Sequence, residues 1–235
     1  MPRSRDIGIK NFFIRIELEP SGVCNLERVD HSGRFLVLEG IDGSGKSTQM
    51  QRIHKRLIEK KVSAISTFEP TDGPVGSLIR KMLSGSVETD QLTIASLFAA
   101  DRTDHLLNRA NGVKAMVDQG QVVLCDRYYF SSYAYHAQYM DMDWVIQANA
   151  LNAKILRPTA TFFIDVDPDI CLERIRANRD SLDMYEKIDI LKRVRDNYFL
   201  AFEKFKDQEK VILIDGNDLP DRVEKNIWKI VQDLL

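Results

Sequence analysis

Short runs of apolar residues alternate along the chain with longer segments in which apolar residues recur every three or four positions. A short apolar run flanked by turn-forming residues is typical of a buried β-strand, and the longer repeat is typical of a helix. The predicted strands cover residues 35–38, 62–68, 121–125, 161–166 and 211–214. The predicted helices cover residues 47–61, 74–83, 89–120 with a break at 111–112, 131–139, 143–151, 168–176, 184–205 and 218–235.

Strands that are apolar on both faces and separated by helices predict an α/β fold. Such strands pair in parallel, because each connection crosses the sheet through a helix, and helices then cover both faces. We therefore expect one domain over residues 34–235 with a five-stranded parallel sheet.

Residues 1–33 precede the first of these strands and form an N-terminal extension of uncertain structure. Within the extension, residues 12–19 alternate apolar and charged side chains, which predicts a strand with one face in water. Three roles remain open for this segment: an extra edge strand, a contact with a partner chain, or a poorly ordered leader.

A glycine-rich segment separates the first predicted strand from the first predicted helix. Residues 40–47 fit the pattern G-x-x-x-x-G-K-[ST], in which backbone N–H groups and a helix N-terminus surround a phosphate. The lysine of this pattern reaches the β- and γ-phosphates, and the hydroxyl after it ligates Mg²⁺. The predicted ATP-binding residues of this segment are Gly40, Asp42, Gly43, Ser44, Gly45, Lys46, Ser47 and Thr48. The alternative is a glycine-rich turn that binds no ligand.

Polar clusters follow the later strands or line the neighbouring helices. Ligands collect at the carboxyl ends of parallel strands, where these clusters would meet. Arginine suits phosphate binding because its planar fork pairs with phosphate oxygens and stays charged, and phosphoryl transfer relies on such charge neutralisation. The clusters are Glu69-Pro70 with Arg80, Phe98 with Arg102, Asp126-Arg127-Tyr128 with residues 131–136, and the arginines Arg174, Arg176 and Arg179.

Two aspartates would lie beside the bound phosphates. Asp126 follows the third predicted strand, next to the phosphate loop, and is a natural outer-shell ligand for Mg²⁺. Asp42 lies inside the loop and would contact the metal or position an acceptor. Ser47 and Asp126 are therefore the predicted metal-binding residues.

Taken together and in this order, the motifs resemble those of the thymidylate kinases, which belong to the P-loop nucleoside-monophosphate kinases. The resemblance covers roughly residues 34–235. It implies a three-layer P-loop fold with a short lid at about 177–185, and ATP-dependent phosphorylation of dTMP to dTDP with Mg²⁺ as cofactor. The matching segments are residues 38–49, 69–70 with Arg80, 98–102, 126–128 with 131–135, 163–166 and the lid.

The resemblance also implies roles for individual residues. Phe98 would stack on the thymine, Arg102 would bond the base edge, and Tyr135 would crowd the sugar 2′ position. The implied acceptor-site residues are Asp42, Glu69, Pro70, Arg80, Phe98, Arg102, Arg127, Ser132, Tyr135 and His136. The implied catalytic residues are Lys46, Asp42, Arg127, Arg174 and Arg179, and Arg174 and Asn217 would add contacts to ATP.

Two positions depart from the family pattern. Met184 stands where many relatives with a glycine-only phosphate loop carry the lid arginine, so that Arg179 would have to replace it. His136 stands where bacterial relatives often carry glutamine.

Other functions remain open at this point. In a deoxynucleoside kinase Glu69 would act as base toward a sugar hydroxyl, although Arg80 and Arg127 argue for a phosphorylated acceptor. A kinase for dUMP or UMP is a second alternative, and Tyr135 argues weakly against ribose. A non-catalytic nucleotide-binding regulator is a third, suggested by Met184 but disfavoured by the intact phosphate loop.

Charge and hydrophobicity argue against nucleic acid and membranes as binding partners. Lysine and arginine number 33 and acidic residues 35, which gives a net charge of −2 and no broad basic surface for nucleic acid. No apolar run approaches the roughly 18 residues of a membrane span, and residues 1–10 lack the apolar core of a secretion signal. We therefore expect a cytoplasmic protein without membrane contact.

The cysteines and histidines predict no metal site, and the long helical stretch is a candidate subunit interface. The three cysteines, Cys24, Cys125 and Cys171, show no metal-binding spacing and are expected to be reduced thiols. His31, His54 and His105 show no ligand spacing and are expected to be ordinary surface or helix residues. The family resemblance suggests a homodimer, with residues 89–120 as a candidate interface.

Overall fold

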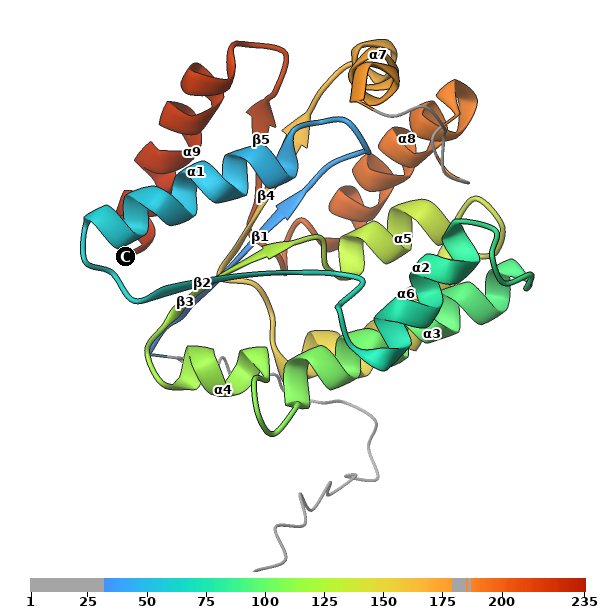
Figure 1. The fold of residues 1–235 in the computed structure, drawn as a ribbon, viewed down its shortest axis with the longest axis horizontal. Helices are drawn as coiled ribbons and strands as arrows, with labels where there is room; N and C mark the ends of the chain where they lie inside the picture. The colour runs from blue at the N-terminus through green and yellow to red at the C-terminus, as the bar shows by residue number, and fades with distance from the viewer. Residues whose placement is uncertain (1–31, 179–184, 186) are drawn as a thin grey trace, which may run out of the picture. The chain divides into compact units, whose positions relative to one another are not determined.

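A sheet of five parallel strands lies at the centre of the part of the chain that the structure, a computed structural model, describes: residues 32–178, 185 and 187–235. The order across the sheet is β2-β3-β1-β4-β5, and every neighbouring pair is parallel (Figure 1). This confirms the predicted sheet. The strands are β1 (Arg34–Glu39), β2 (Ala64–Phe68), β3 (Val122–Asp126), β4 (Ala160–Asp165) and β5 (Val211–Asp215).

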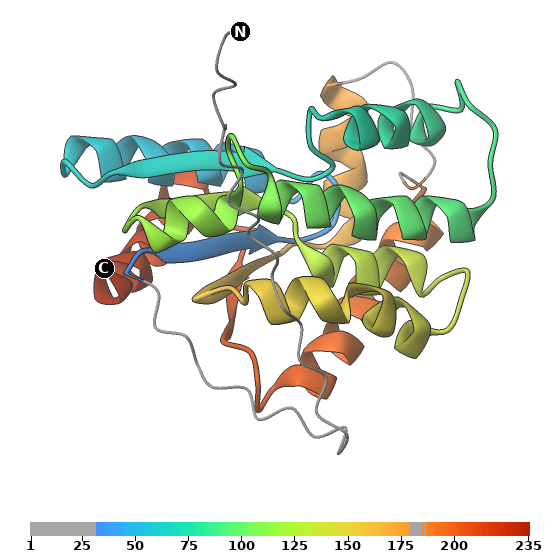
Figure 2. The same cartoon turned by 90° about the horizontal axis from the view of Figure 1, so that it is seen from below.

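Helices cover both faces of the sheet. Helices α1 and α9 pack together on one face, where α1 contacts β1, β2 and β3 and α9 contacts β5. Helices α3, α4, α5, α6 and α8 lie on the other face, as Figures 1 and 2 show. The predicted three-layer α/β fold is therefore confirmed. The helices of the described residues are α1 (Lys46–Glu59), α2 (Pro74–Leu83), α3 (Gln91–Leu107), α4 (Val113–Asp118), α5 (Tyr129–His136), α6 (Met142–Ile155), α7 (Pro168–Asn178), α8 (Ile188–Phe205) and α9 (Pro220–Leu234).

Several helix boundaries differ from the prediction by a few residues, and three of these differences have a local cause. The stretch 89–120 begins as a helix at Gln91, because the Asp90 carboxylate accepts a hydrogen bond from the Thr93 N–H at 2.9 Å and caps the helix. Helix α5 stops at His136 rather than 139, where the Tyr139 N–H turns back to the His136 carbonyl at 2.9 Å. Helix α8 begins at 188 rather than 184, because Lys187 has an extended backbone.

Burial follows the position of each strand in the sheet. Strand β1 lies between β3 and β4, and its residues 35–38 are almost fully buried. The edge strands β2 and β5 are only partly buried, so the expectation that every strand is buried on both faces was wrong for these two. The loops after β1, β3 and β4 consequently meet at the middle of the carboxyl edge, where a site is expected.

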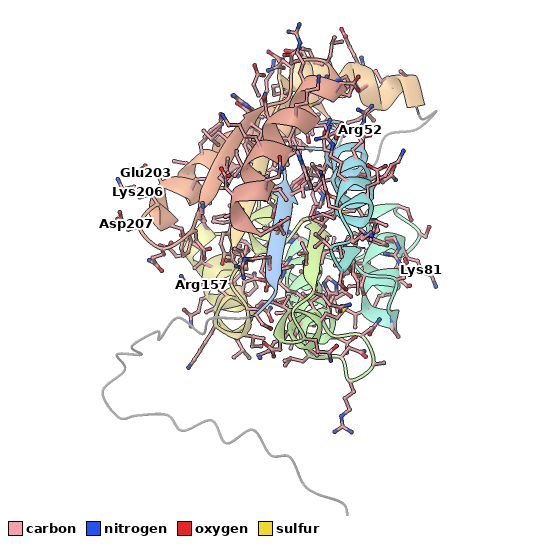
Figure 3. The ribbon with its side chains drawn as sticks, turned by 90° about the vertical axis from the view of Figure 1, so that its left-hand side faces the viewer. Arg52, Lys81, Arg157, Glu203, Lys206 and Asp207 are labelled. Carbon is pink, nitrogen blue, oxygen red and sulfur yellow. The ribbon has the colours of Figure 1, made fainter. Side chains whose placement is uncertain are left out.

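Ion pairs fix helix α1, which carries the lysine of the phosphate loop, to α9. Arg52, labelled in Figure 3, pairs with Asp221 at 2.5 Å, and Arg56 pairs with Glu224 at 2.5 Å. The Arg56 guanidinium also lies 5.5 Å from the centre of the Trp228 ring. Exposed pairs of this kind contribute at most about 1 kcal/mol each, so their role is mainly to set the position of the helix.

Some of the remaining expectations can be compared with the structure, and others concern residues that it does not describe. Cys125 and Cys171 are buried free thiols, as predicted. None of the helices in the described ranges is both long and apolar enough to span a bilayer. Cys24, the strand at 12–19, Arg179 and Met184 lie outside the described residues.

Candidate active site

The segment between β1 and α1 has the backbone of a phosphate loop. Gly43 and Gly45 have φ values of 81° and 92°, in the left-handed region that favours glycine. A Cβ on Gly43 would lie 2.4 Å from the Cys171 carbonyl oxygen, so a larger residue does not fit. Gly45 precedes α1 and provides no side-chain cap, which leaves the N–H groups of the first turn for a ligand.

A cavity of about 370 Å³ lies beside this loop. It brings together the loops that follow β1 and β3 and the helix α7. Among the described residues its lining is Asp42, Gly43, Gly45, Lys46, Ser47, Thr48, Asp126, Arg127, Arg174 and Ile175. All of these except Ile175 are residues that the sequence predicts for the site.

Lys46 and Ser47 start α1 at the wall of this cavity. Lys46 is 6% exposed, and its Nζ donates to the Ile41 carbonyl at 2.9 Å. Burial and the nearby Arg127 lower the pKa of Lys46, against the opposing effect of the carboxylates of Asp126 and Asp42. The Ser47 hydroxyl donates to Asp126 Oδ2 at 2.6 Å, which places two hard oxygen donors together, as Mg²⁺ requires.

Arg127 connects the phosphate loop to helix α5. It follows β3 with a φ of 72°, which is uncommon for a residue other than glycine. Its guanidinium pairs with Asp42 and donates to the Gly40 carbonyl at 3.2 Å, Ser131 Oγ at 3.0 Å and the Tyr135 hydroxyl at 3.1 Å. The Tyr135 hydroxyl in turn donates to Asp42 Oδ2 at 2.9 Å.

The charges of this pair support each other. Burial acts to raise the pKa of Asp42, but Arg127 and Lys46 outweigh it and lower that pKa. Burial acts to lower the pKa of Arg127, but Asp42 outweighs it and raises that pKa. Both side chains are therefore ionised at neutral pH.

A second polar cluster surrounds Arg102, which is 1% exposed on α3. Arg102 Nε and Nη2 bond Glu69 Oε2 at 2.8 and 2.7 Å, and Nη1 donates to Ser132 Oγ at 3.1 Å and to Asn149 Oδ1. Burial acts to lower the pKa of Arg102, but Glu69 outweighs it and raises that pKa. The sequence predicts three of these four residues for the acceptor site but not Asn149.

His136 and Phe98 lie beside each other next to this cluster, with ring centres 5.2 Å apart. Burial, with a smaller effect of the Arg102 charge, lowers the pKa of His136 to about 3. The imidazole is therefore neutral at physiological pH. Its Nδ1 is buried and has no hydrogen-bond partner within the described part of the chain.

Arg80 does not line the cavity. Its guanidinium donates to the carbonyls of Pro70 at 2.9 Å and Thr71 at 2.7 Å, and it pairs with Asp72 at 3.1 Å. The side chain is 40% exposed, so it holds the loop after β2 and still faces solvent.

The predicted residues Arg174, Arg176 and Asn217 lie in different places. Arg174 lines the cavity and donates to the carbonyls of Gly43 and Gly216 at 3.4 and 3.5 Å. Arg176 is exposed and outside the lining. Asn217 accepts a hydrogen bond from the Asp167 N–H at 3.1 Å, beside the loop after β4.

Glu39 is a residue of the site that sequence reasoning missed. It is fully buried at the end of β1 and accepts hydrogen bonds from the Tyr128 and Ser131 N–H groups, Ser131 Oγ and the Tyr198 hydroxyl, at 2.6 to 3.1 Å. Burial raises the pKa of Glu39. A glutamate at the end of an apolar strand, directly before the glycine loop, is the signal that could have identified it.

His105 is a helix residue, as one part of the expectation had it, but it is not at the surface. It is buried, and its Nδ1 lies 3.0 Å from Glu69 Oε1. The spacing of three residues from Arg102 puts both side chains on one face of α3.

The loop, the cavity and the residues around it first identify the class of protein. A glycine loop between a parallel strand and a helix, with a lysine and a serine at the wall of a cavity, is the site of a P-loop nucleotide-binding protein. Comparison with known proteins then gives the family. The sequence model of the family described as "Thymidylate kinase" matches residues 38–227.

Individual relatives agree with the family match. The "Probable thymidylate kinase" of Staphylothermus marinus is 34% identical over 207 residues, which cover 88% of this chain and 98% of the relative. That of Methanocaldococcus jannaschii is 39% identical over 172 residues, 73% of this chain and 82% of the relative. The "Thymidylate kinase" of Acholeplasma laidlawii is 37% identical over 207 residues, 85% of this chain and 96% of the relative. The chain belongs to the thymidylate kinase family, a family of phosphotransferases, and the resemblance stated from its motifs is confirmed.

Proposed function

We propose that this protein transfers the γ-phosphate of ATP to dTMP and forms dTDP and ADP. The observation that carries the proposal is the position of Arg127. It lines the cavity of the phosphate loop and also contacts Tyr135 on the side of the Arg102 cluster. An arginine that contacts both the donor-phosphate loop and helix α5, which carries Ser132 and His136 of the proposed base site, supports an acceptor that carries a phosphate.

The transfer itself needs alignment rather than a base. An oxygen of the dTMP phosphate attacks the γ-phosphorus, the bond to the β,γ-bridging oxygen breaks, and ADP leaves with the bonding electrons. A phosphate monoester is largely dianionic at neutral pH, since its second pKa is about 6, so no side chain has to remove a proton. The task of the protein is to hold both phosphates in line and to neutralise charge.

On the donor side, the loop N–H groups and Lys46 would bind the phosphates of ATP, with Arg174 and Thr48 at the wall of the same cavity. Asn217 would lie along the adenine. The hydroxyl of Ser47 and the carboxylate of Asp126 fit Mg²⁺, with Asp42 nearby. When bound, Mg²⁺ neutralises charge on the β- and γ-phosphate oxygens.

On the acceptor side, Arg127 would bind the dTMP phosphate, with Arg80 at the outer end. Phe98 would stack on the base. The base edge would meet Arg102, Ser132 and the neutral imidazole of His136. Glu69 and Pro70 would form the adjoining wall, and Tyr135 would crowd the sugar 2′ position.

The structure argues against the deoxynucleoside kinase. In that enzyme Glu69 would remove a proton from a sugar hydroxyl. Here the Glu69 side chain is 2% exposed, with Arg102 on one oxygen and His105 on the other. A carboxylate engaged at both oxygens is a poor base for a substrate hydroxyl.

Three further expectations stay predictions. Arg179 would supply charge at transfer from the lid. The protein would form a homodimer with residues 89–120 as a candidate interface, and it would be cytoplasmic.

A panel of acceptors tests the proposal. ADP release is measured with ATP and Mg²⁺ and, in turn, dTMP, dUMP, UMP, dCMP and thymidine. We expect the largest kcat/KM with dTMP, and a preference for thymidine would contradict the proposal. Lys46→Ala should abolish turnover and leave dTMP binding by calorimetry within about twofold, since Lys46 would bind the phosphates of ATP and not those of the acceptor. Lys55→Ala is the matched control, because Lys55 lies exposed on the same helix, and it should leave turnover unchanged.

A further inference from the structure

A chain of hydrogen bonds runs behind the acceptor cluster through strand β2 and helix α3. The Thr67 hydroxyl lies 2.7 Å from His105 Nε2, and His105 Nδ1 lies 3.0 Å from Glu69 Oε1. The other oxygen of Glu69 binds Arg102 at 2.7 and 2.8 Å. The chain thus ends on the residue that would read the base.

The chemistry of these groups fixes the direction of each bond. Glu69 pairs with the charged Arg102 and can only accept hydrogen bonds. The Nδ1 of His105 must therefore carry the proton and donate to Glu69. With one proton on the ring, Nε2 accepts from the Thr67 hydroxyl, and that bond favours the tautomer with the proton on Nδ1.

Both oxygens of Glu69 are therefore engaged, and this fixes the plane of the carboxylate. Without His105, Oε1 would be buried and unpaired, which is costly for a carboxylate. The carboxylate would turn to recover a partner, and the bonds that it makes to Arg102 would change with it.

Arg102 has little freedom while this chain is intact. Of the five N–H groups of a guanidinium, the one on Nε donates to Glu69, and Nη2 forms an ion pair with the same oxygen at 2.7 Å, a distance that commits one of its two N–H groups. The two on Nη1 donate to Ser132 and Asn149. One N–H on Nη2 has no bond to any of the described residues.

We propose that His105 is a positioning residue for base recognition: through Glu69 it holds Arg102 so that a single N–H is left for the acceptor base. The proposal rests on the proposed function. A single fixed donor suits a pyrimidine carbonyl oxygen, as in thymine. It disfavours the amino group that cytosine carries at the corresponding position, because two donors would meet.

A metal site is the competing interpretation of the same residues. Glu69, His105 and Cys125 place ligand atoms within 4.8 Å of one another, and all three are buried. However, the oxygens of Glu69 already accept from Arg102 and His105, and a cation would have to lie beside the Arg102 charge. Hydrogen bonding accounts for the cluster without a metal.

Two matched substitutions test the positioning role. His105→Asn places an amide N–H near the position of Nδ1, whereas His105→Gln places one near Nε2. His105→Phe removes both nitrogens. We expect His105→Phe and His105→Gln to raise the KM for dTMP roughly tenfold and to lower the kcat/KM preference for dTMP over dCMP. The KM for ATP should stay unchanged. His105→Asn should keep a dTMP KM and a dTMP-to-dCMP preference close to those of the wild-type protein. His54→Asn on α1 is the control and should change neither KM.

The outcomes separate this proposal from the proposed function. If the wild-type protein does not phosphorylate dTMP, the function fails before any variant is compared. If it does, and His105→Phe lowers the melting temperature with the dTMP KM and the dTMP-to-dCMP preference unchanged, His105 is only structural. Equal behaviour of His105→Asn and His105→Gln also overturns the proposal. Should His105→Phe fail to fold, Thr67→Val provides the test, because loss of the Thr67 hydroxyl should shift the same preference in the same direction and no shift would refute it.

Discussion

The substitution His136→Gln removes an imidazole that is almost fully buried on α5 beside Phe98. Burial, with the Arg102 charge, lowers the pKa of His136 from 6.5 to about 3 in the folded protein. Glutamine is similar in size and polar but does not titrate. The substitution therefore isolates the effect of this ionisation on the stability of the fold.

The sign of the effect follows from proton binding. Above pH 6.5 the imidazole is neutral in the folded and the unfolded chain, and its titration does not affect stability. Between pH 6.5 and about 3 the unfolded chain binds a proton that the folded chain does not, so the free energy of unfolding falls as the pH falls. The slope is roughly 1.4 kcal/mol per pH unit, which amounts to about 3 kcal/mol at about pH 4.5.

Urea unfolding of both proteins at about pH 7.5 and about pH 4.5 measures this effect. The carboxylates contribute equally to both proteins, so the comparison of the two pH dependences isolates His136. We expect His136→Gln to lose about 3 kcal/mol less than the wild-type protein between the two pH values. Equal losses would refute the reasoning and would mean that His136 is protonated in the folded protein or exposed to water.

Three further substitutions test other parts of the site. Gly43→Ala should weaken ATP binding by at least roughly tenfold, since its Cβ would lie 2.4 Å from the Cys171 carbonyl, and calorimetry with ATP would contradict this by giving an unchanged affinity. Arg127→Lys keeps the charge but loses the planar fork, so the KM for dTMP should rise roughly tenfold and that for ATP by less than twofold, and an equal rise in both would argue against an acceptor role. Glu39→Ala should cost about 3–5 kcal/mol in urea unfolding because it leaves the buried Tyr198 hydroxyl and other donors without their acceptor, and a cost under 1 kcal/mol would show that water replaces the carboxylate.

The sequence predicted the sheet and the phosphate loop because both are written in local patterns. The apolar runs of β1, β3 and β4 and the glycine spacing before Lys46 each lie within a few residues of one another. Even there the edge strand β2 was misjudged, since burial depends on which strand lies at the edge.

Long-range contacts have no such signature. The Tyr198 hydroxyl bonds Glu39 across 159 positions, and Asn149 bonds Arg102 across 47. Each of these residues, taken alone, resembles an ordinary helix residue. His105 was expected to be an ordinary surface or helix residue, and its partners could not be predicted because they become clear only once α3 is packed against β2.

Arg127 shows how the fold can align two substrates. A φ of 72° costs a residue with a side chain roughly 1–3 kcal/mol and persists only where its surroundings hold it. Here the Arg127 N–H bonds the Leu38 carbonyl at 2.9 Å, and its guanidinium is held by Gly40, Asp42 and the Tyr135 hydroxyl. The donor loop therefore fixes the arginine that would bind the acceptor phosphate. In the proposed reaction the distance between the two phosphates is then set largely before substrates arrive.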